Sequence, residues 1–414
     1  MIARYPSLPI KYTLEVEARC NNNCFGCGNV FKKNTNIKKQ LSVAEWGKII
    51  QDISSHAKFV KITGGEPTLS PNFKAIIELL DQHGISFAVL TNGRWQSPKK
   101  LIELLGSKKN FRGMLVSLHG TTTSIHSAFV GTESFDETCA NIEYASRYIN
   151  VATNTVITGH NYQTMPGIVR FSQKLGAKSA SFSRYIGASI DGITPSYEEL
   201  QLALQDLERL KANGAKIKYG PCIPQCFEPS SAAGCSAGIS FCSIDPWGNV
   251  RACNHSTEIA GSLKEQSIHN IWHGKSMKSW RNLIPIECVS CQALDYCAGG
   301  CKAQMMQLGM SKDPLMTLPL MTQPPPKHLK LPKKGRPFLT SNIVLDTNTG
   351  EYSLISRAKQ EFITKEAKEM LENLNGQYTL EEINTNSGLE TINLIGSLWQ
   401  KGFIEIHNLH QTNI

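Results

Sequence analysis

Short apolar runs alternate with amphipathic segments along the first half of the chain. Runs rich in β-branched and aromatic residues predict strands at 12–17, 59–63, 85–91, 114–118, 150–157 and 179–185. The segments between them begin with capping signals, which are Ser42 with Glu45, Ser196 with Glu199, and a serine before proline at Ser70 and Ser97. Six strand–helix units in a row predict an α/β fold, with a parallel sheet buried by helices as an open (β/α)6 partial barrel.

The alternation stops near residue 215, and the pattern then changes twice. Residues 216–309 are crowded with cysteines, and residues 310–337 hold seven prolines with interspersed lysines, which predicts a semi-rigid linker. Beyond it, β-rich runs at 338–345 and 352–355 flank a hairpin signal at 347–350. Helices are then expected at 357–374, 380–385 and 389–401, the second of them behind the capping box of Thr379 and Glu382. A final strand is expected at 403–407. We therefore expect domains at 1–215, 216–309 and 338–414.

Composition narrows the class of protein. The chain has 414 residues, of which 41% are hydrophobic and 19% charged, as in a soluble globular protein. It shows no apolar run of transmembrane length and no signal peptide at its start, so we expect a cytoplasmic protein without a membrane partner. The net charge of +9 comes from short, scattered lysine runs, which indicate a solvated surface. Thirteen cysteines in such a chain point to metal binding or catalysis rather than disulfides.

The first cysteines form a compact motif directly after the first predicted strand. They stand at C-x3-C-x2-C spacing, as Cys20, Cys24 and Cys27. A [4Fe–4S] cluster has four irons, so three cysteine ligands leave one iron open for a ligand that is not protein. A zinc knuckle or three spare thiols are the alternatives.

A second motif, Gly64-Gly65-Glu66-Pro67, follows the second predicted strand at Thr63. Its glycines allow a close backbone approach and its acid supplies a carboxylate, although such a turn is common by itself. Together the two motifs resemble those of the radical S-adenosylmethionine (SAM) enzymes. The resemblance implies a partial TIM barrel with its active site at the carboxyl ends of the strands.

The same resemblance implies that the open iron binds SAM and that reductive cleavage of SAM yields a 5′-deoxyadenosyl radical. It assigns the cluster to the three cysteines and SAM contacts to Phe25, Thr63, Gly64, Gly65, Glu66, Pro67, Asn92, Ser117, Asn154 and Arg184. Glu66 would receive the methionyl ammonium, and Arg184 would pair with the SAM carboxylate. One departure is visible, since this family usually has an aromatic residue where Gly26 stands, and Phe25 comes one position earlier.

The later cysteines form a second resemblance. They are Cys222, Cys226, Cys235, Cys242, Cys253, Cys288, Cys291, Cys297 and Cys301. The last four read C-x2-C-x5-C-x3-C, and together with the spacing from Cys235 to Cys253 they resemble the SPASM domain, which usually carries two auxiliary [4Fe–4S] clusters. A zinc-ribbon-like domain is the alternative.

The resemblance also distributes the auxiliary ligands. It implies Cys235, Cys253 and Cys301 for the first cluster, with Cys226 as the preferred fourth ligand. It implies Cys288, Cys291 and Cys297 for the second. Because no cysteine follows Cys301, the fourth position of the second cluster stays open between Cys222, Cys242, an oxygen ligand and the substrate.

The C-terminal pattern resembles the PqqD-like recognition element, a small winged-helix fold that binds the leader of a ribosomally made precursor peptide as an added strand. The combined architecture implies a maturase of such peptides, reduced by a flavodoxin- or ferredoxin-type electron donor. Nucleic acid is an unlikely partner, because the last helix, 389–401, carries one lysine and no arginine. The alternatives are a radical SAM enzyme that modifies a folded protein, as sulfatase-maturing relatives do, and a non-catalytic peptide-binding iron–sulfur protein.

Overall fold

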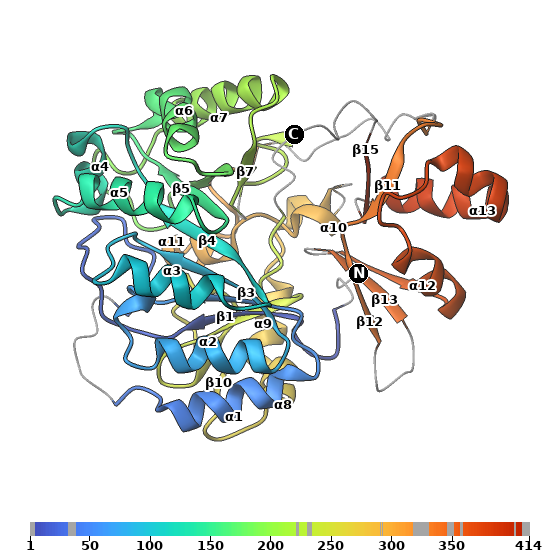
Figure 1. Ribbon diagram of the computed structural model, residues 1–414, viewed down its shortest axis with the longest axis horizontal. Helices are drawn as coiled ribbons and strands as arrows, with labels where there is room; N and C mark the ends of the chain where they lie inside the picture. Colours follow the sequence, from blue (N-terminus) through green and yellow to red (C-terminus); the bar gives the residue numbers. More distant parts are fainter. Residues whose placement is uncertain are drawn as a thin grey trace.

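The computed structural model describes residues 5–31, 39–220, 223–229, 234–289, 291, 293–317, 331–345, 352–356, 359–400 and 403–407. It consists of a large α/β body, formed by the first three quarters of the chain, and a smaller C-terminal unit beside it (Figure 1). The hairpin signal at 347–350 and the triple proline at 324–326 lie outside the described residues.

The large body is organised by one sheet. Its parallel strands are β1 (Lys11–Glu15), β2 (Phe59–Thr63), β3 (Ser86–Thr91), β4 (Phe111–Ser117), β5 (Val151–Ile157), β6 (Ser179–Arg184) and β7 (Ile217–Tyr219), adjacent in this order. Six of them match the predicted strands within a few residues, and the short β7 is an addition. The prediction of an α/β partial barrel is confirmed.

Helices pack along the outer side of this curved sheet (Figure 1). They are α1 (Val43–Ser54), α2 (Phe73–Gln82), α3 (Pro98–Gly106), α4 (Thr123–Val130), α5 (Phe135–Ser146), α6 (Met165–Lys174) and α7 (Tyr197–Ala212). The capping boxes predicted at Ser42 and Ser196 are both formed. The start predicted at Pro71 is displaced, since residues Pro67–Leu69 form a 3-10 turn and α2 begins behind Asn72.

The cysteine-rich region extends the same sheet. Strand β8 (Phe241–Ile244) lies parallel to β1, and β9 (Asn249–Arg251) and β10 (Gly261–Ser262) follow antiparallel. The remaining elements are α8 (Ile268–Trp272), α9 (Lys275–Asn282), α10 (Leu294–Cys297) and α11 (Lys302–Leu308). One hydrophobic core runs from the barrel strands through this region and includes Trp272 and Trp280. The barrel and the cysteine-rich region are therefore packed as one body.

The C-terminal unit combines two small antiparallel sheets with two helices. Strand β11 (Arg336–Leu339) pairs with β15 (Ile404–His407), while β12 (Asn342–Leu345), β13 (Tyr352–Ser356) and β14 (Lys359–Ile363) form a three-stranded sheet. Helix α12 covers Lys365–Glu372, and α13 covers Leu380–Gln400 with a break at Gly388, where φ is 80°.

Two predictions for this unit were wrong. The run 338–345 is two strands with different partners, and the helix expected from 357 starts only at Lys365, behind the cap residue Thr364. Residues Lys359–Ile363 are a strand instead, because they pair with β13. The capping box of Thr379 and Glu382 and the separation of two helical segments near residue 388 agree with the prediction. Among the described residues, no helix combines the length and the apolar character needed to cross a membrane.

Candidate active site

The loop that follows β1 carries the first cysteine motif at the carboxyl edge of the sheet. The thiols of Cys20 and Cys27 are exposed, and the thiol of Cys24 is half-buried. The loop is fastened to the end of α4 by two backbone hydrogen bonds, in which Asn23 N–H donates to Val130 O at 3.2 Å and Phe25 N–H donates to Phe129 O at 3.0 Å. The backbone is thus fixed at its centre, and the Phe25 ring, 59% exposed, stays on the surface.

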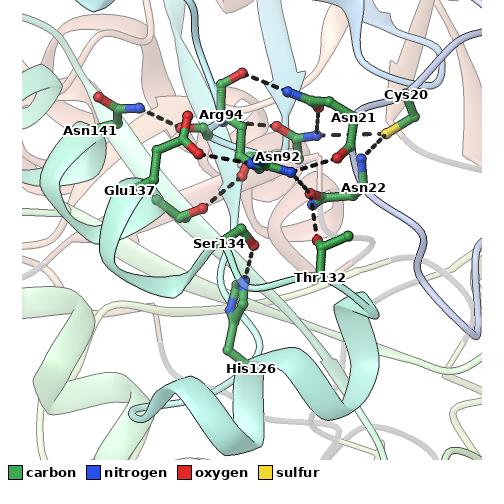
Figure 2. A network of polar contacts seen from close by, with 12 residues as sticks. Cys20, Asn21, Asn22, Asn92, Arg94, His126, Thr132, Ser134, Glu137 and Asn141 are labelled. Atoms are coloured by element: carbon green, nitrogen blue, oxygen red, sulfur yellow. Dashed lines mark hydrogen bonds and ion pairs between the residues drawn. The ribbon is translucent and has the colours of Figure 1, made fainter.

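A polar network holds the start of the loop against the end of β3 (Figure 2). Asn92 Nδ2 donates to Asn21 Oδ1 at 2.7 Å and lies 3.6 Å from Cys20 Sγ. Arg94 Nη1 donates to the carbonyl of Asn21 at 2.5 Å, and its Nε pairs with Glu137 of α5 at 2.9 Å. The predicted site residue Asn92 is therefore beside Cys20, but its amide supports the cysteine loop. Nothing in the local sequence marked Asn21 or Arg94.

The two glycines after β2 are required by the chain itself. A Cβ at Gly64 would meet the backbone of Glu17 at 3.0 Å or less, and a Cβ at Gly65 would meet the carbonyl group of Arg19. Gly65 N–H and Glu66 N–H donate to the carbonyl oxygens of Glu17 and Arg19, at 2.7 and 2.8 Å. The turn after β2 therefore lies directly under the segment that leads to Cys20, which aligns the two motifs.

Glu66 is completely buried, and both of its carboxylate oxygens accept hydrogen bonds from the protein. Oε1 accepts from the hydroxyls of Thr68 at 2.7 Å and Thr91 at 2.8 Å, and Oε2 accepts from Asn92 N–H at 2.8 Å. Burial raises the pKa of Glu66, and these hydrogen bonds oppose the shift. In this arrangement the carboxylate ties the end of β2 to the end of β3.

A row of polar side chains crosses the sheet near its carboxyl edge. Ser117 on β4 is level with Asn154 on β5, and Asn154 is level with Ser181 on β6. Partners in register share one face of a parallel sheet, and all three residues are half-buried. Asn92, one residue beyond β3, continues the row, because Thr91 is level with Val116. The structure thus brings Asn92, Ser117 and Asn154 together on the face opposite the helices.

Arg184 was expected to meet the SAM carboxylate, and the structure places it elsewhere. Along β6 the half-buried Ser181 and Ser183 alternate with buried residues, and Arg184 belongs to the buried set, with 5% exposure. Its Nη1 donates to both carboxylate oxygens of the fully buried Asp313, at 2.7 and 2.8 Å. Asp313 lies in the segment predicted to be a linker, which no local signal would have linked to β6. We correct the expectation for Arg184 accordingly.

One group of cysteines lies where the cysteine-rich region meets the barrel. Its members are buried and close enough to interact electrostatically, namely Cys235, Cys253 and Cys301. Burial raises the pKa of the Cys253 thiol, and the two neighbouring thiols raise it further. The buried ammonium of Lys302 donates to the carbonyls of Trp280 and Arg281 at 3.0 and 3.1 Å. Burial lowers the pKa of Lys302, and its interaction with Cys235 opposes part of that shift.

A second group lines a small cavity of about 20 Å³. Four cysteines line it, Cys226, Cys288, Cys291 and Cys297. Burial and the neighbouring thiols raise the pKa of Cys288 to about 12. Cys226 was expected with the first group, but the segment after β7 brings it here. Cys242 joins neither group, because it is fully buried on β8 beside Tyr12 of β1. Cys222 lies outside the described residues.

The donor sets fit iron–sulfur clusters. Closely spaced thiolates repel one another, and burial penalises each charge, so such groups become stable when a metal centre neutralises them. A cavity lined by four cysteine sulfurs provides the complement that a [4Fe–4S] cluster takes. Three thiols on one loop provide the complement that leaves one iron open. Within the described part of the chain, no three His, Cys, Asp or Glu side chains converge as ligands of a single metal ion.

Comparisons with known proteins agree with this geometry. Residues 14–172 match the radical SAM superfamily, and residues 235–302 match the SPASM iron–sulfur cluster-binding domain. The chain is 27% identical over 323 residues to the mycofactocin maturase MftC of Mycobacterium tuberculosis, covering 74% of this chain and 81% of that protein. It is 21% identical over 340 residues to the PqqA peptide cyclase of Ruegeria pomeroyi, covering 77% and 89%.

Among solved structures, the fold is similar to that of Streptococcus suis SuiB bound to the precursor peptide SuiA. The TM-score is 0.65 at 17% sequence identity, over 76% of this chain and 77% of SuiB. Both cysteine motifs, the partial barrel and the two family matches coincide along the chain. The protein is therefore a radical SAM enzyme that carries a SPASM iron–sulfur domain.

Proposed function

We propose that the protein is a maturase that modifies a ribosomally synthesised precursor peptide by radical chemistry. The observation that carries this proposal is the joint presence of an exposed cysteine loop at the mouth of an open barrel and a separate C-terminal unit with an antiparallel sheet. The similarity to a mycofactocin maturase, a peptide cyclase and a structure bound to a precursor peptide supports it.

Cys20, Cys24 and Cys27 would hold the catalytic cluster. When bound, the cluster and SAM supply the 5′-deoxyadenosyl radical that abstracts hydrogen from the substrate. The chain fixes where this happens, since the Asn92–Asn21 contact and the buried Glu66 hold the loop over the ends of β2 and β3. The polar row of Ser117 and Asn154 would line the cofactor on the open face of the sheet. Thr63, Pro67 and the exposed Phe25 ring remain candidates for further SAM contacts.

The auxiliary ligands are proposed from the two cysteine groups. Cys226, Cys288, Cys291 and Cys297 would bind one cluster, with Cys226 replacing the ligand that the family places after the last cysteine of the motif. Cys235, Cys253 and Cys301 would bind the other, and Cys222 is the remaining thiol that could complete it. Cys242 would bind neither, because its thiol is fixed within the sheet.

The C-terminal unit would bind the leader of the peptide. In the three-stranded sheet β13 is central, and no other described strand pairs with the outer edge of β14. An extended peptide can add to such an edge through main-chain hydrogen bonds. Helix α13, broken at Gly388, follows this sheet, and this order of elements supports the PqqD-like assignment. We also propose reduction by a flavodoxin- or ferredoxin-type donor in the cytoplasm.

The test is anaerobic co-expression with a short peptide encoded beside the gene, followed by mass spectrometry. We expect a changed mass or, for epimerisation, a mass that is unchanged in H2O and rises in D2O through deuterium at an α-carbon. The Cys20→Ala variant should leave the peptide unmodified and produce no 5′-deoxyadenosine. A peptide without its N-terminal leader should be modified at least tenfold more slowly.

Other outcomes separate the alternatives. Abundant 5′-deoxyadenosine with every candidate peptide unaltered, and with activity unchanged after deletion of residues 338–414, would favour modification of a folded protein. Peptide binding without any cleavage of SAM under reducing conditions would favour a non-catalytic iron–sulfur protein. Either result would overturn the proposal.

A further inference from the structure

The cysteine loop is contacted from two sides at the residues that flank Cys27. On one side the ring of Tyr185 lies against Gly26, and a Cβ at Gly26 would stand 2.7 Å from Tyr185 Cε2. Tyr185 is nearly buried, and its hydroxyl donates to Ala188 O at 2.9 Å, which fixes the ring. Gly26 stands where the family usually has an aromatic residue, and here the ring of Tyr185, the residue directly after β6, packs on that position.

The segment that carries Tyr185 is joined by an ion pair and hydrogen bonds to the residues around Cys301. Arg184 pairs with Asp313, and Asp313 Oδ2 accepts the backbone N–H of Cys301 at 2.7 Å. Gly187 and Gln304 exchange two hydrogen bonds, at 2.8 and 2.9 Å, which join the exit of β6 to the helix that follows Cys301. A short run of residues after β6 therefore contacts the catalytic loop at one end and the neighbourhood of an auxiliary cysteine at the other.

On the other side, the imidazole of His255 lies against Gly28. A Cβ at Gly28 would stand 2.6 Å from His255 Nδ1, and this nitrogen is buried with no hydrogen-bond partner among the described residues. The backbone N–H of His255 donates to Cys253 Sγ at 3.4 Å, and its carbonyl accepts from Gln307 of α11 at 2.8 Å. His255 thus connects the catalytic loop with a second cysteine of the same auxiliary group.

Both contacts need glycine for reasons of space. Neither Gly26 nor Gly28 is among the glycines with positive φ, so the backbone at both positions is open to other residues. At Gly26 the rings of Tyr185 and Phe129 exclude a side chain, and at Gly28 the ring of His255 excludes one. The glycines that flank Cys27 thus permit the rings to approach the loop backbone directly.

We propose that Tyr185 and His255 are positioning residues that set the separation between the catalytic cluster at Cys27 and the auxiliary cluster at Cys253 and Cys301. His255 N–H donates to Cys253 Sγ, and the segment that carries Tyr185 is linked to Cys301 through Asp313. Each ring also packs against a glycine next to Cys27, so the two rings act as spacers. Outer-shell groups commonly orient cluster ligands and tune them in this way. This inference rests on the cluster ligands assigned under the proposed function.

The experiment places the full-length, reconstituted enzyme in an EPR spectrometer after reduction with dithionite. Clusters reduced together interact magnetically, and this interaction changes with their separation. The test variant is Gly28→Ala, which pushes the loop away from His255. The matched control is Gly47→Ala in α1, where the nearest atom to a new Cβ is 3.7 Å away, so there is room. We expect a changed spin–spin interaction in Gly28→Ala and an unchanged one in Gly47→Ala.

Two further variants keep the test decisive if Gly28→Ala loads poorly. His255→Ala removes the spacer without adding bulk and should also change the interaction. The double variant Gly28→Ala/His255→Ala should regain the iron content that Gly28→Ala loses, because the clash is gone, while its spin–spin interaction stays altered. A spectrum of His255→Ala identical to that of the wild type, or no rescue of iron content in the double variant, would overturn the inference. Wild-type protein whose iron and sulfide content accounts for only one cluster would instead contradict the ligand assignment.

Discussion

The cysteine loop after β1 and the two groups of the cysteine-rich region present their thiols in opposite ways. Cys20, Cys24 and Cys27 come from one loop, on which Cys20 and Cys27 are exposed and Cys24 is half-buried. The auxiliary groups draw on segments from residue 226 to residue 301, and all seven of their thiols are buried or half-buried. The first site needs only a short stretch of backbone in the right shape. The second needs the tertiary fold to be complete, so its ligands cannot be assigned from spacing alone.

The largest expected effect is a loss of iron, and it tests which thiols bind the cluster in the cysteine-rich region. Cys226→Ala should lower the iron content by about four atoms per chain, because a buried cluster that loses one of four ligands is not retained. Cys242→Ala, which removes a thiol of the same region from the sheet, should leave the iron content unchanged. Iron and sulfide analysis of both purified variants is the measurement. Unchanged iron content in Cys226→Ala would show that the cavity at Cys226 is not a cluster site.

A smaller effect should come from the ion pair that joins the barrel to the auxiliary region. Asp313→Ala removes the carboxylate that pairs with the buried Arg184, and breaking a buried pair by removing one member costs about 3–5 kcal/mol of stability. The exposed pair of Arg147 and Glu143 is the control, since Glu143→Ala should change stability by at most about 1 kcal/mol. Urea unfolding of the three proteins compares them. Similar losses in both variants would mean that the Asp313 pair does not join the two regions.

The smallest expected effect is on the pH dependence of stability, through the buried His119 of the barrel. Burial lowers the pKa of His119 to about 3, from an ordinary value of 6.5, so the fold favours its neutral form. The stability that this group contributes is present above pH 6.5 and is lost as the pH falls from 6.5 towards 3, because only the unfolded chain takes up the proton. The slope is about 1.4 kcal/mol per pH unit for this one group.

His119→Gln should remove that slope, and His83→Gln, which alters an exposed histidine, should retain it. The measurement is urea unfolding of both variants between pH 5 and pH 7. An unchanged slope in His119→Gln would mean that the histidine is solvated or protonated in the folded enzyme.

The sequence predicted what short-range chemistry determines. Capping boxes at Ser42, Ser196 and Thr379 form from residues three apart, and the six main strands follow from local apolar runs. The predictions failed where a distant segment supplies the partner. Residues Lys359–Ile363 become a strand because β13 lies beside them, and Arg184 turns to Asp313 because the segment after α11 folds back onto β6.

The same distinction holds within the candidate site. The glycines at 64 and 65 were predicted to allow a close approach, and the close approach is made by the chain's own segment at Glu17 and Arg19. Cys226 changed groups because its position depends on how the chain leaves β7, which no spacing records. His255 carried no signal, since its importance lies in a contact with Gly28 across the fold.

Strand β1 has neighbours made at very different times. On one side it pairs with β2, and on the other with β8, where Lys11 is level with Phe241. During synthesis, β1 therefore emerges with one edge that has no partner until the cysteine-rich region has left the ribosome. Unpaired strand edges invite aggregation, and nascent chains fold from their N-terminal end. The sheet can thus gain its partner for this edge of β1 only after β8 has been made, and the cysteines from Cys253 to Cys301 follow β8 in the chain.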